Sequence, residues 1–496
     1  MDEHRDGWQP EGAKWVVLYG SYDGVERSAV HEIQRRVSSF VPYVVQIRRV
    51  GDDPPGTDEN VVLVGTPENN RWIRQLINDR AIQSPPGPQG YSLACLESPF
   101  QENRCLIVVA GGDSDGVLHG AHELLARILS DGIWFDFSAR PRDGYGPIGP
   151  IPMTSDLERI PNLLTSGAPA IDHRGIWTWG YAIYDYRRFF ANMARLKLNM
   201  VTIWNNTVPI NASEVIEYAH SYGIRVIMGF HWGWGRKGLS LTDADDMRRT
   251  KEEVVRTYKE QYASLDLDGI YFQTLTEHLS TEQSGGSTAA LACDWVNEIA
   301  SALFEVEPDL SIQFGLHAAS IREHYADLRS LDRRITIVWE DVAGFPYAYN
   351  LSDEDTSQES VQQAIDYTAD LVHLRPGLDF GMVPKGWTQL KWRDFHGPYV
   401  LGEEDPRSIR EALRERETTW RFLEQSWLQH YPKAAHFYRE LLAMKPEGII
   451  VTGLLEDTIL EETIPLPIAL YAEMLWDPFQ DDAEILRRAM SSYYRC

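Results

Sequence analysis

The feature that most constrains the fold of this chain is a regular alternation that begins near Asp172. Short apolar runs, each followed by a helix-like segment, recur eight times over about 300 residues, at 173–179, 200–204, 224–230, 268–277, 310–317, 334–340, 379–383 and 449–455. Parallel strands buried on both faces read as nearly continuous hydrophobic runs, and this number of units is typical of one TIM barrel. A doubly wound open sheet is the alternative, but no G-x-G-x-x-G turn follows the first run. The sequence therefore predicts an α/β fold with a (β/α)8 barrel over residues 171–480.

The first third of the chain shows a shorter alternation of strand-like and helix-like segments between Trp15 and Leu129. This pattern favours a compact α/β unit with helices on a mixed sheet. The Pro/Gly-rich stretch 140–152 is typical of a linker. We therefore divide the chain into a small α/β domain (1–150), a linker (151–170), the barrel (171–480) and the start of a C-terminal helical segment (481–496).

One motif in this first unit matches the nucleophile elbow of esterases. Gly112-Asp-Ser114-Asp-Gly116 has the form G-x-S-x-G and lies between a strand-like and a helix-like segment. Asp113 and Asp115 flank the hydroxyl, and their negative charge would oppose an oxyanion beside it. Asp and Ser before a helix are also common capping residues. We favour capping and keep an esterase that uses Ser114 as an alternative.

The charge of the chain excludes two classes of partner. The 496 residues include 73 acidic and 47 basic side chains, which gives a formal net charge of -26, and no long Lys/Arg run occurs. Binding to nucleic acid or to an anionic membrane depends on clustered positive charge. We therefore expect no nucleic-acid partner and no membrane partner.

The N-terminus and the cysteines indicate the compartment. No basic segment followed by an apolar stretch opens the sequence, and no apolar run long enough for a membrane span follows. We expect a cytoplasmic protein. Cys95, Cys105, Cys293 and Cys496 lack zinc-like spacing, so we expect free thiols.

Polar and aromatic side chains gather where the eight apolar runs end. In TIM barrels the chemistry sits at the C-terminal ends of the strands. Indoles beside amides, imidazoles and carboxylates suit a ligand that offers hydroxyl groups and flat C–H faces, as sugars do. Any single His or Trp is more often a packing residue, so the collective placement carries the argument. The candidate substrate-binding residues are Arg174, Trp177, Trp204, Asn205, His231, Trp232, Trp234, His317, Trp339, Lys385 and Trp387. The same ring includes Trp179, Glu456 and Asp457, to which we assign no role.

Carboxyl groups at two of these strand ends suggest a reaction. The fourth run ends on Glu277, and the sixth ends on Glu340 and Asp341. Glycoside hydrolysis needs only two facing carboxyl groups, one protonated and one ionised. Neither an H-E-x-x-H motif nor a P-loop occurs, although metal ligands from separate strands stay open. We expect no metal and no cofactor, and we take Glu277, Glu340 and Asp341 as the catalytic candidates.

Four further segments resemble known glycoside hydrolases. They are Asp115–Leu125, Arg174–Trp177, Met193–Met200 and Tyr218–Ile224. Together they resemble the α-glucuronidases of glycoside hydrolase families 67 and 115, and more loosely the β-N-acetylhexosaminidases. The similarity covers residues 15–280. It implies a small α/β domain of the hexosaminidase/glucuronidase N-terminal type, followed by the barrel.

The resemblance also implies roles for the carboxyl groups. The fourth strand looks like the family 67 strand that ends in Ser-Glu, which makes Glu277 the general acid. Glu340 or Asp341 lies where that family supplies a base that activates water by inversion. The chain departs from family 67 on the seventh strand, where Val383-Pro-Lys385-Gly-Trp387 offers no acid. It departs from the hexosaminidases because Thr276, and not Asp, precedes Glu277.

The sequence thus predicts a glycosidase that removes a sugar, with a uronic acid as the candidate, and acts in polysaccharide degradation. Its expected partner is an oligosaccharide or glycoside substrate, and a homodimer stays open as its assembly. Two alternatives remain: a β-N-acetylhexosaminidase-like enzyme, and a non-catalytic carbohydrate-binding protein on the same scaffold.

Overall fold

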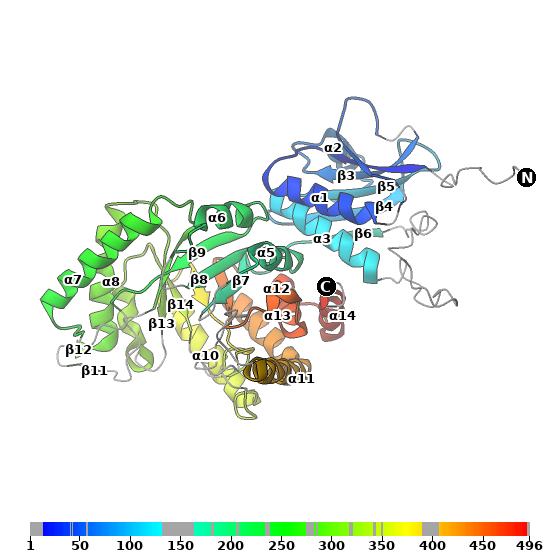
Figure 1. The fold of residues 1–496 in the computed structure, drawn as a ribbon. Coiled ribbons are helices and arrows are strands. Elements are labelled where there is room, and N and C mark those ends of the chain that lie inside the picture. The colour runs from blue at the N-terminus through cyan, green and yellow to red at the C-terminus, as the bar shows by residue number, and fades with distance from the viewer. Residues whose placement is uncertain are drawn as a thin grey trace, which may run out of the picture. The chain divides into compact units, whose positions relative to one another are not determined.

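The computed structural model describes residues 13–130 and 163–493, apart from 40, 42, 56–57, 180–182, 205–207, 234–238, 274–281, 284–285, 317–320, 341–343, 349–350 and 389–405. The chain forms two compact units, one up to Pro169 and one that begins at Ala170 (Figure 1). A three-residue segment, Ser221–Gly223, is grouped with the first unit.

The first unit contains a six-stranded mixed sheet in the order β2-β1-β3-β5-β4-β6. Its strands are β1 (Lys14–Tyr19), β2 (Gln46–Arg49), β3 (Glu59–Gly65), β4 (Tyr91–Glu97), β5 (Cys105–Gly111) and β6 (Leu163–Gly167). β1, β2, β3 and β5 run parallel, whereas β4 is antiparallel to β5 and β6. The predicted small α/β domain is confirmed.

In the part of this unit that the structure describes, three helices flank the sheet: α1 (Gly24–Ser38), α2 (Arg71–Asn78) and α3 (Ser114–Ser130). α2 lies on one face, with α1 and α3 on the other (Figure 1). The core under α2 joins Trp72, Ile73 and Leu76 to alternating residues of β1, β3 and β5, which is the period-2 pattern of one face of a sheet. Part of the expected linker is ordered structure, because β6 pairs with β4 from Tyr91–Gly167 to Cys95–Leu163.

Ser114 occupies the first position of α3. The carboxylate of Asp113 accepts hydrogen bonds from the backbone N–H groups of Gly116 (2.8 Å) and Gln89 (2.8 Å), as a capping residue does. The Ser114 hydroxyl lies 3.4 Å from Oε1 of Glu26. Its contact is thus a carboxylate, and the capping interpretation accounts for the motif.

The second unit is a closed barrel of eight parallel strands, which confirms the predicted TIM barrel. The strands are β7 (His173–Thr178), β8 (Met200–Trp204), β9 (Arg225–Gly229), β10 (Gly269–Phe272), β13 (Ile312–Leu316), β14 (Ile335–Trp339), β15 (Phe380–Met382) and β16 (Ile449–Leu455). β16 pairs with β7 over six residues and closes the ring. The fourth strand, β10, ends earlier than predicted, at Phe272.

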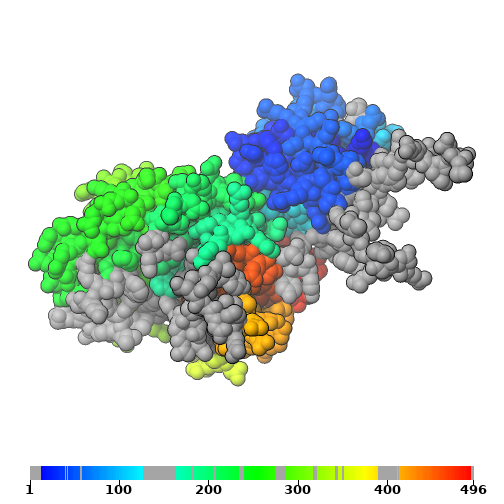
Figure 2. All heavy atoms as spheres, in the orientation of Figure 1, coloured from blue at the N-terminus to red at the C-terminus, as the bar shows by residue number. Residues whose placement is uncertain are grey.

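Helices surround the barrel (Figure 1). They are α5 (Tyr186–Arg195), α6 (Ala212–His220), α7 (Ala244–Thr257), α8 (Thr288–Phe304), α10 (Gln358–Leu374), α11 (Pro406–Met444), α12 (Ile459–Glu462), α13 (Leu466–Trp476) and α14 (Asp482–Tyr493). A 3-10 helix, Arg322–Ser330, replaces the α-helix expected after the fifth strand. A two-stranded hairpin of β11 (Glu282–Gln283) and β12 (Gly286–Ser287) precedes α8. In Figure 2 the green atoms of α7 and α8 form part of the outer surface.

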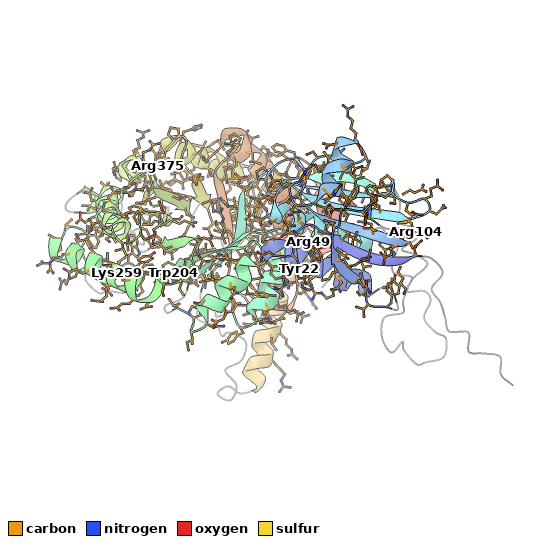
Figure 3. All side chains as sticks on the ribbon, turned by 90° about the horizontal axis from the view of Figure 1, so that it is seen from above. Tyr22, Arg49, Arg104, Trp204, Lys259 and Arg375 are labelled. Carbon is orange, nitrogen blue, oxygen red and sulfur yellow. The ribbon has the colours of Figure 1, made fainter. Side chains whose placement is uncertain are left out.

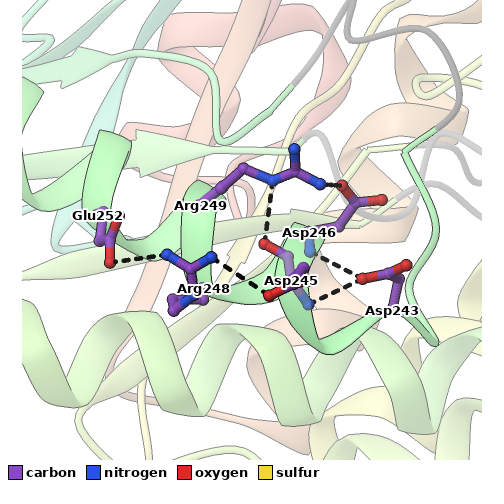
Figure 4. Close-up of polar contacts among 6 residues, drawn as sticks. All are labelled: Asp243, Asp245, Asp246, Arg248, Arg249 and Glu252. Atoms are coloured by element: carbon purple, nitrogen blue, oxygen red, sulfur yellow. Dashed lines mark hydrogen bonds and ion pairs between the residues drawn. The ribbon is translucent and has the colours of Figure 1, made fainter.

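The sequence at the start of α7 shows why a helix begins there (Figure 4). Asp243 accepts hydrogen bonds from the backbone N–H groups of Asp245 (2.8 Å) and Asp246 (3.1 Å). Acidic residues in the first turn of a helix interact favourably with the positive end of the helix dipole. Arg248 and Arg249 then pair with Asp245 and Asp246 at 3.2 and 2.9 Å. These exposed ion pairs contribute little stability, so the cap defines the boundary.

The interior of the barrel is filled by side chains from alternate positions of its strands. The inward-facing cluster comprises Trp177, Met200, Trp204, Ile227, Tyr271, Val338, Val383, Ile450 and Leu454. Because successive side chains of a strand point to opposite faces, the residue two positions after each inward one also points inward. Glu340, Lys385 and Glu456 therefore follow Val338, Val383 and Leu454 at the C-terminal mouth.

Candidate active site at the C-terminal mouth of the barrel

Glu340 lies at the centre of a group of polar side chains at this mouth. It follows β14 directly and is 1% exposed. The phenol of Tyr271, from β10, donates a hydrogen bond to Oε1 of Glu340. The ammonium group of Lys385, which follows β15, lies 3.5 Å from Oε2. A donor and a cation on the two oxygens of a buried carboxylate stabilise its negative charge.

A glycine on the intervening strand makes the contact between Tyr271 and Glu340 possible. Gly315 lies on β13, between β10 and β14 in the barrel. A Cβ at Gly315 would lie 2.1 Å from the Tyr271 hydroxyl and 2.4 Å from Oε1 of Glu340. Any other residue would push these groups apart. The missing side chain thus supplies the space in which the two polar groups meet.

Glu456 is a second buried carboxyl group at the mouth. It follows β16 and is 4% exposed. Among the described residues, its Oε1 has no hydrogen-bond partner. Burial raises the pKa of Glu456 to about 7, although the positive charge of Lys385 acts to lower it. A large fraction of Glu456 therefore carries its proton near neutral pH, as a general acid or a hydrogen-bond donor must.

Asp457, the next residue, is held by α11. Arg416 donates to both oxygens of its carboxylate, with Nε at 2.9 and 2.8 Å and Nη2 at 2.5 Å. The indole N–H of Trp420 donates to Oδ2 at 3.0 Å. This bidentate pair fixes the turn that follows β16. Asp457 is therefore engaged in structure, and the adjacent Glu456 projects from a fixed backbone.

Among the described residues, three indoles line the same mouth, and Figure 3 labels one of them, Trp204. Trp177 and Trp204 are buried, and Trp179 is half-buried. Trp179 stacks on Trp177 with ring centroids 5.8 Å apart and lies 5.3 Å from Trp204. The Trp204 ring occupies space over Gly229 of β9, where a Cβ would lie 2.3 Å from it. These rings form an aromatic wall beside the carboxyl groups.

The structure places Arg174 away from this mouth, at the N-terminal end of β7. Its guanidinium donates to the backbone carbonyls of Ile171 (2.6 Å), Asp172 (3.1 Å) and Lys197 (2.8 and 3.0 Å). These bonds connect the start of β7 to the turn between α5 and β8. The structure therefore does not bring Arg174 to the predicted site, and its position is the end of a barrel strand that serves stability.

Three predicted tryptophans lie in packing layers. Trp232 stacks on Phe272 with centroids 3.5 Å apart, and Trp339 packs edge-on against Tyr367 of α10 at 4.9 Å. Trp387 packs against Tyr471 of α13 at 4.6 Å. Each is at most 2% exposed. The structure therefore does not bring these three rings to the mouth as exposed stacking surfaces, because each is almost completely buried.

Of the remaining predicted residues, the structure describes one, His231. His231 is half-buried two positions after β9, and its Nδ1 has no partner among the described residues. Five predicted residues lie outside the described residues: Glu277, Asn205, Trp234, His317 and Asp341.

The structure adds Tyr271 to the predicted group. Tyr271 lies inside an apolar strand, where nothing in the sequence distinguishes it from a packing residue. Trp179 and Glu456 belong to the predicted ring without a role, and the structure places each two residues beyond an inward-facing position of its strand. Within the part of the chain that the structure describes, no group of three His, Cys, Asp or Glu residues could hold a metal ion. No helix there has the length and apolarity needed to cross a membrane.

Comparisons with known proteins show the fold. No protein-family model matches the sequence, and no curated protein matches it. A GH138 enzyme targeting the pectin rhamnogalacturonan II is similar in structure, with a TM-score of 0.51 and 10% identity. That similarity covers 95% of this chain, which spans only 51% of the GH138 enzyme. A chitobiase from Flavobacterium johnsoniae (GH20) has a TM-score of 0.48 and 11% identity. That match covers 98% of this chain and 70% of the chitobiase chain. At such identities the likeness to the GH138 enzyme concerns the fold alone, a small α/β domain followed by a TIM barrel.

Proposed function

We propose that this chain is a glycoside hydrolase that uses carboxyl groups as its acid and base. The observation that carries the proposal is the contact of Glu340 with Tyr271 and Lys385 at the C-terminal mouth of the barrel. A buried carboxylate held by protein groups, beside an aromatic wall, supplies two of the features that glycoside hydrolysis uses. The shared fold with a GH138 enzyme supports the same class of reaction.

In this proposal Glu340 or Asp341 is the base and Glu277 is the general acid, as the resemblance to family 67 implies. Tyr271 and Lys385 hold Glu340 in one orientation. A base that activates water on the far face of the sugar inverts the anomeric centre. We therefore expect the released sugar to have the anomeric configuration opposite to that of the substrate. NMR spectra recorded in the first minutes of the reaction test this.

The finer proposal is that the sugar is a uronic acid. Lys385 is the described cation at the mouth that could approach a substrate carboxylate, although it already pairs with Glu340. The fourth strand departs from the hexosaminidase pattern and the seventh strand departs from the family 67 pattern. Uronides must therefore be compared directly with neutral and N-acetylated sugars.

A screen of aryl glycosides tests both levels. Uronides, neutral glycosides and N-acetylhexosaminides are incubated with the wild type and with Glu277→Gln, Glu340→Gln and Glu354→Gln. Glu354 is exposed and serves as the control. We expect hydrolysis of a uronide, loss of about 10²-fold or more in kcat for the first two variants, and an unchanged control. Cleavage of N-acetylhexosaminides alone would favour the hexosaminidase alternative.

One observation favours the second candidate, a carbohydrate-binding protein without turnover. Both oxygens of Glu340 are engaged by protein groups, as in a structural ion pair. If that candidate is right, sugars bind to the wild type and to Glu340→Gln, while no aryl glycoside is cleaved by either.

A further inference from the structure

The carboxyl group of Glu456 has no assigned part in the proposed reaction and no partner for one of its oxygens. Oε1 is buried, and none of the described residues hydrogen-bonds to it. Leaving a buried polar atom unsatisfied is unfavourable, so such an atom in a native protein calls for an explanation. A ligand hydroxyl group that both donates and accepts would remove this cost.

The barrel register places Glu456 next to an aromatic residue of the neighbouring strand. β16 and β7 are neighbouring strands, with Leu454 opposite Trp177 and Leu455 opposite Thr178. Leu454 and Trp177 both belong to the inward-facing cluster. Two positions further along each strand, Glu456 and Trp179 follow on the same inner face. The register thus makes Glu456 and the half-buried Trp179 neighbours along the mouth.

The surroundings of Glu456 set the kind of contact that it can make. Lys385 is the nearby cation, and its ammonium group is shared with Glu340 at 3.5 Å. The desolvated carboxyl group of Glu456 tends to keep its proton. A neutral carboxyl group both donates and accepts hydrogen bonds, which suits a sugar hydroxyl. An indole face beside it suits the C–H face of a pyranose ring.

We propose that Glu456 and Trp179 form a sugar-binding subsite, in which a pyranose ring stacks on Trp179 and a ring hydroxyl hydrogen-bonds to Oε1 of Glu456. The subsite rests on the proposed function in one respect, that a carbohydrate occupies the mouth. It goes beyond that function because it assigns a binding role to two residues outside the proposed acid and base. Asp457 supports it by holding the backbone through Arg416.

Binding of methyl glycosides tests the subsite without requiring turnover. The probes are the methyl glycosides of glucose, glucuronic acid, galactose, galacturonic acid and xylose, titrated by calorimetry into the wild-type chain. The variants are Glu456→Gln, which keeps the hydrogen bond, Glu456→Leu, which removes it, and Trp179→Ala. Leu fills a similar volume without a buried polar atom, so this variant is expected to fold.

Two further variants are matched controls. Tyr184→Ala removes a 60% exposed aromatic ring from the same connection after β7. Glu440→Gln changes an exposed carboxylate on α11, which lies 3.8 Å from His436 and has no part in the subsite. Thermal unfolding of every variant shows whether a loss of binding reflects a loss of fold.

We expect at least one probe to bind the wild type, with Glu456→Leu and Trp179→Ala each weakening it about tenfold or more, which corresponds to ~1.4 kcal/mol. Glu456→Gln and the controls stay within about threefold of wild type. Equal binding by folded Glu456→Leu, or no binding of any probe to the wild type, overturns the subsite. Failure of the hydrolase proposal looks different: the probes bind and depend on Glu456, but no aryl glycoside is cleaved. Cleavage with an unchanged KM in Glu456→Leu and Trp179→Ala removes the subsite and leaves the hydrolase.

Discussion

Tyr271 donates a hydrogen bond to Glu340 across a strand that lies between them in the barrel. The contact spans from β10 to β14 and passes over Gly315 of β13. The hydrogen bond thus links β10 to β14 in the space that Gly315 of β13 leaves open. The orientation of Glu340 depends on both Tyr271 and Gly315.

Replacement of Gly315 by Ala should disrupt this point. The new methyl group would overlap Tyr271 and Glu340, at 2.1 and 2.4 Å from their oxygens. We expect a loss of about 1–3 kcal/mol in the free energy of unfolding from overpacking, together with a lower kcat on the best aryl glycoside. Urea unfolding and steady-state kinetics measure the two effects. Gly51→Ala, where a Cβ meets no atom within 4 Å, is the control and should change neither. Wild-type behaviour of Gly315→Ala would contradict the described contact.

Glu456 should make the folded protein less stable as the pH rises. Its pKa is raised from the model-compound value of 4.5 to about 7 in the folded state, so the folded state holds the proton more tightly than the unfolded state does. Stability is therefore lost as the pH rises from about 4.5 to about 7, and the loss persists above that pH. Glu456→Gln removes the titrating group, so its free energy of unfolding should increasingly exceed that of wild type across this window, by about 3 kcal/mol at pH 8.

The measurement is urea unfolding of wild type and Glu456→Gln at several pH values between 4 and 8, with Glu354→Gln as the exposed control. Parallel curves for wild type and Glu456→Gln would show that the carboxyl group does not keep its proton on folding.

His220 should have the opposite dependence on pH. The hydrogen bond with Asp268, at 2.9 Å, raises the pKa of this imidazole, and Asp266 adds a nearby negative charge. Because the folded-state pKa is raised, the stabilisation is complete below about pH 6.5 and is lost as the pH rises through the higher folded-state value. His220→Gln should therefore cost about 1 kcal/mol at pH 5.5 and less at pH 9. Thermal unfolding at both pH values tests this, with the exposed His436→Gln as control. A cost that grows with pH would contradict the ion pair.

Removal of Arg416 should be far more costly than removal of a surface arginine. Arg416→Met leaves the buried carboxylate of Asp457 without its cation, and we expect a loss of about 3–5 kcal/mol. Arg421→Met on the same helix breaks an exposed pair with Glu417 and should cost about 0–1 kcal/mol. Chemical unfolding compares the two. Adding Asp457→Asn to Arg416→Met should recover part of the loss, and equal costs for the two single variants would contradict the proposed role of Asp457.

The barrel could be predicted from the sequence because its strands are buried on both faces and appear as uninterrupted apolar runs. The same property hides which side chains point inward. Trp177 and Trp204 lie inside the barrel, whereas Trp232 and Trp339 lie in the outer layer, and a shift of one position separates the two outcomes. Without alternation of polar and apolar residues, the runs could not distinguish them.

Other parts of the site depend on the folded structure. Arg174 was grouped with the mouth although it lies near the start of its run, so attention to strand direction would have excluded it. The pKa of Glu456 arises from burial by neighbouring elements, which a sequence does not display. β6 is far from its partner β4 in the sequence, so the sequence pattern alone indicates a linker there.

The pairing of β16 with β7 also has a consequence during synthesis of the chain. β7 ends at Thr178 and β16 ends at Leu455, so the first strand of the ring emerges from the ribosome long before its last neighbour exists. Until then one margin of β7 offers unpaired backbone groups to any extended segment nearby, a hazard for nascent proteins. Variants that weaken β16 should therefore reduce the yield of soluble protein in cells more than their effect on the purified protein would indicate.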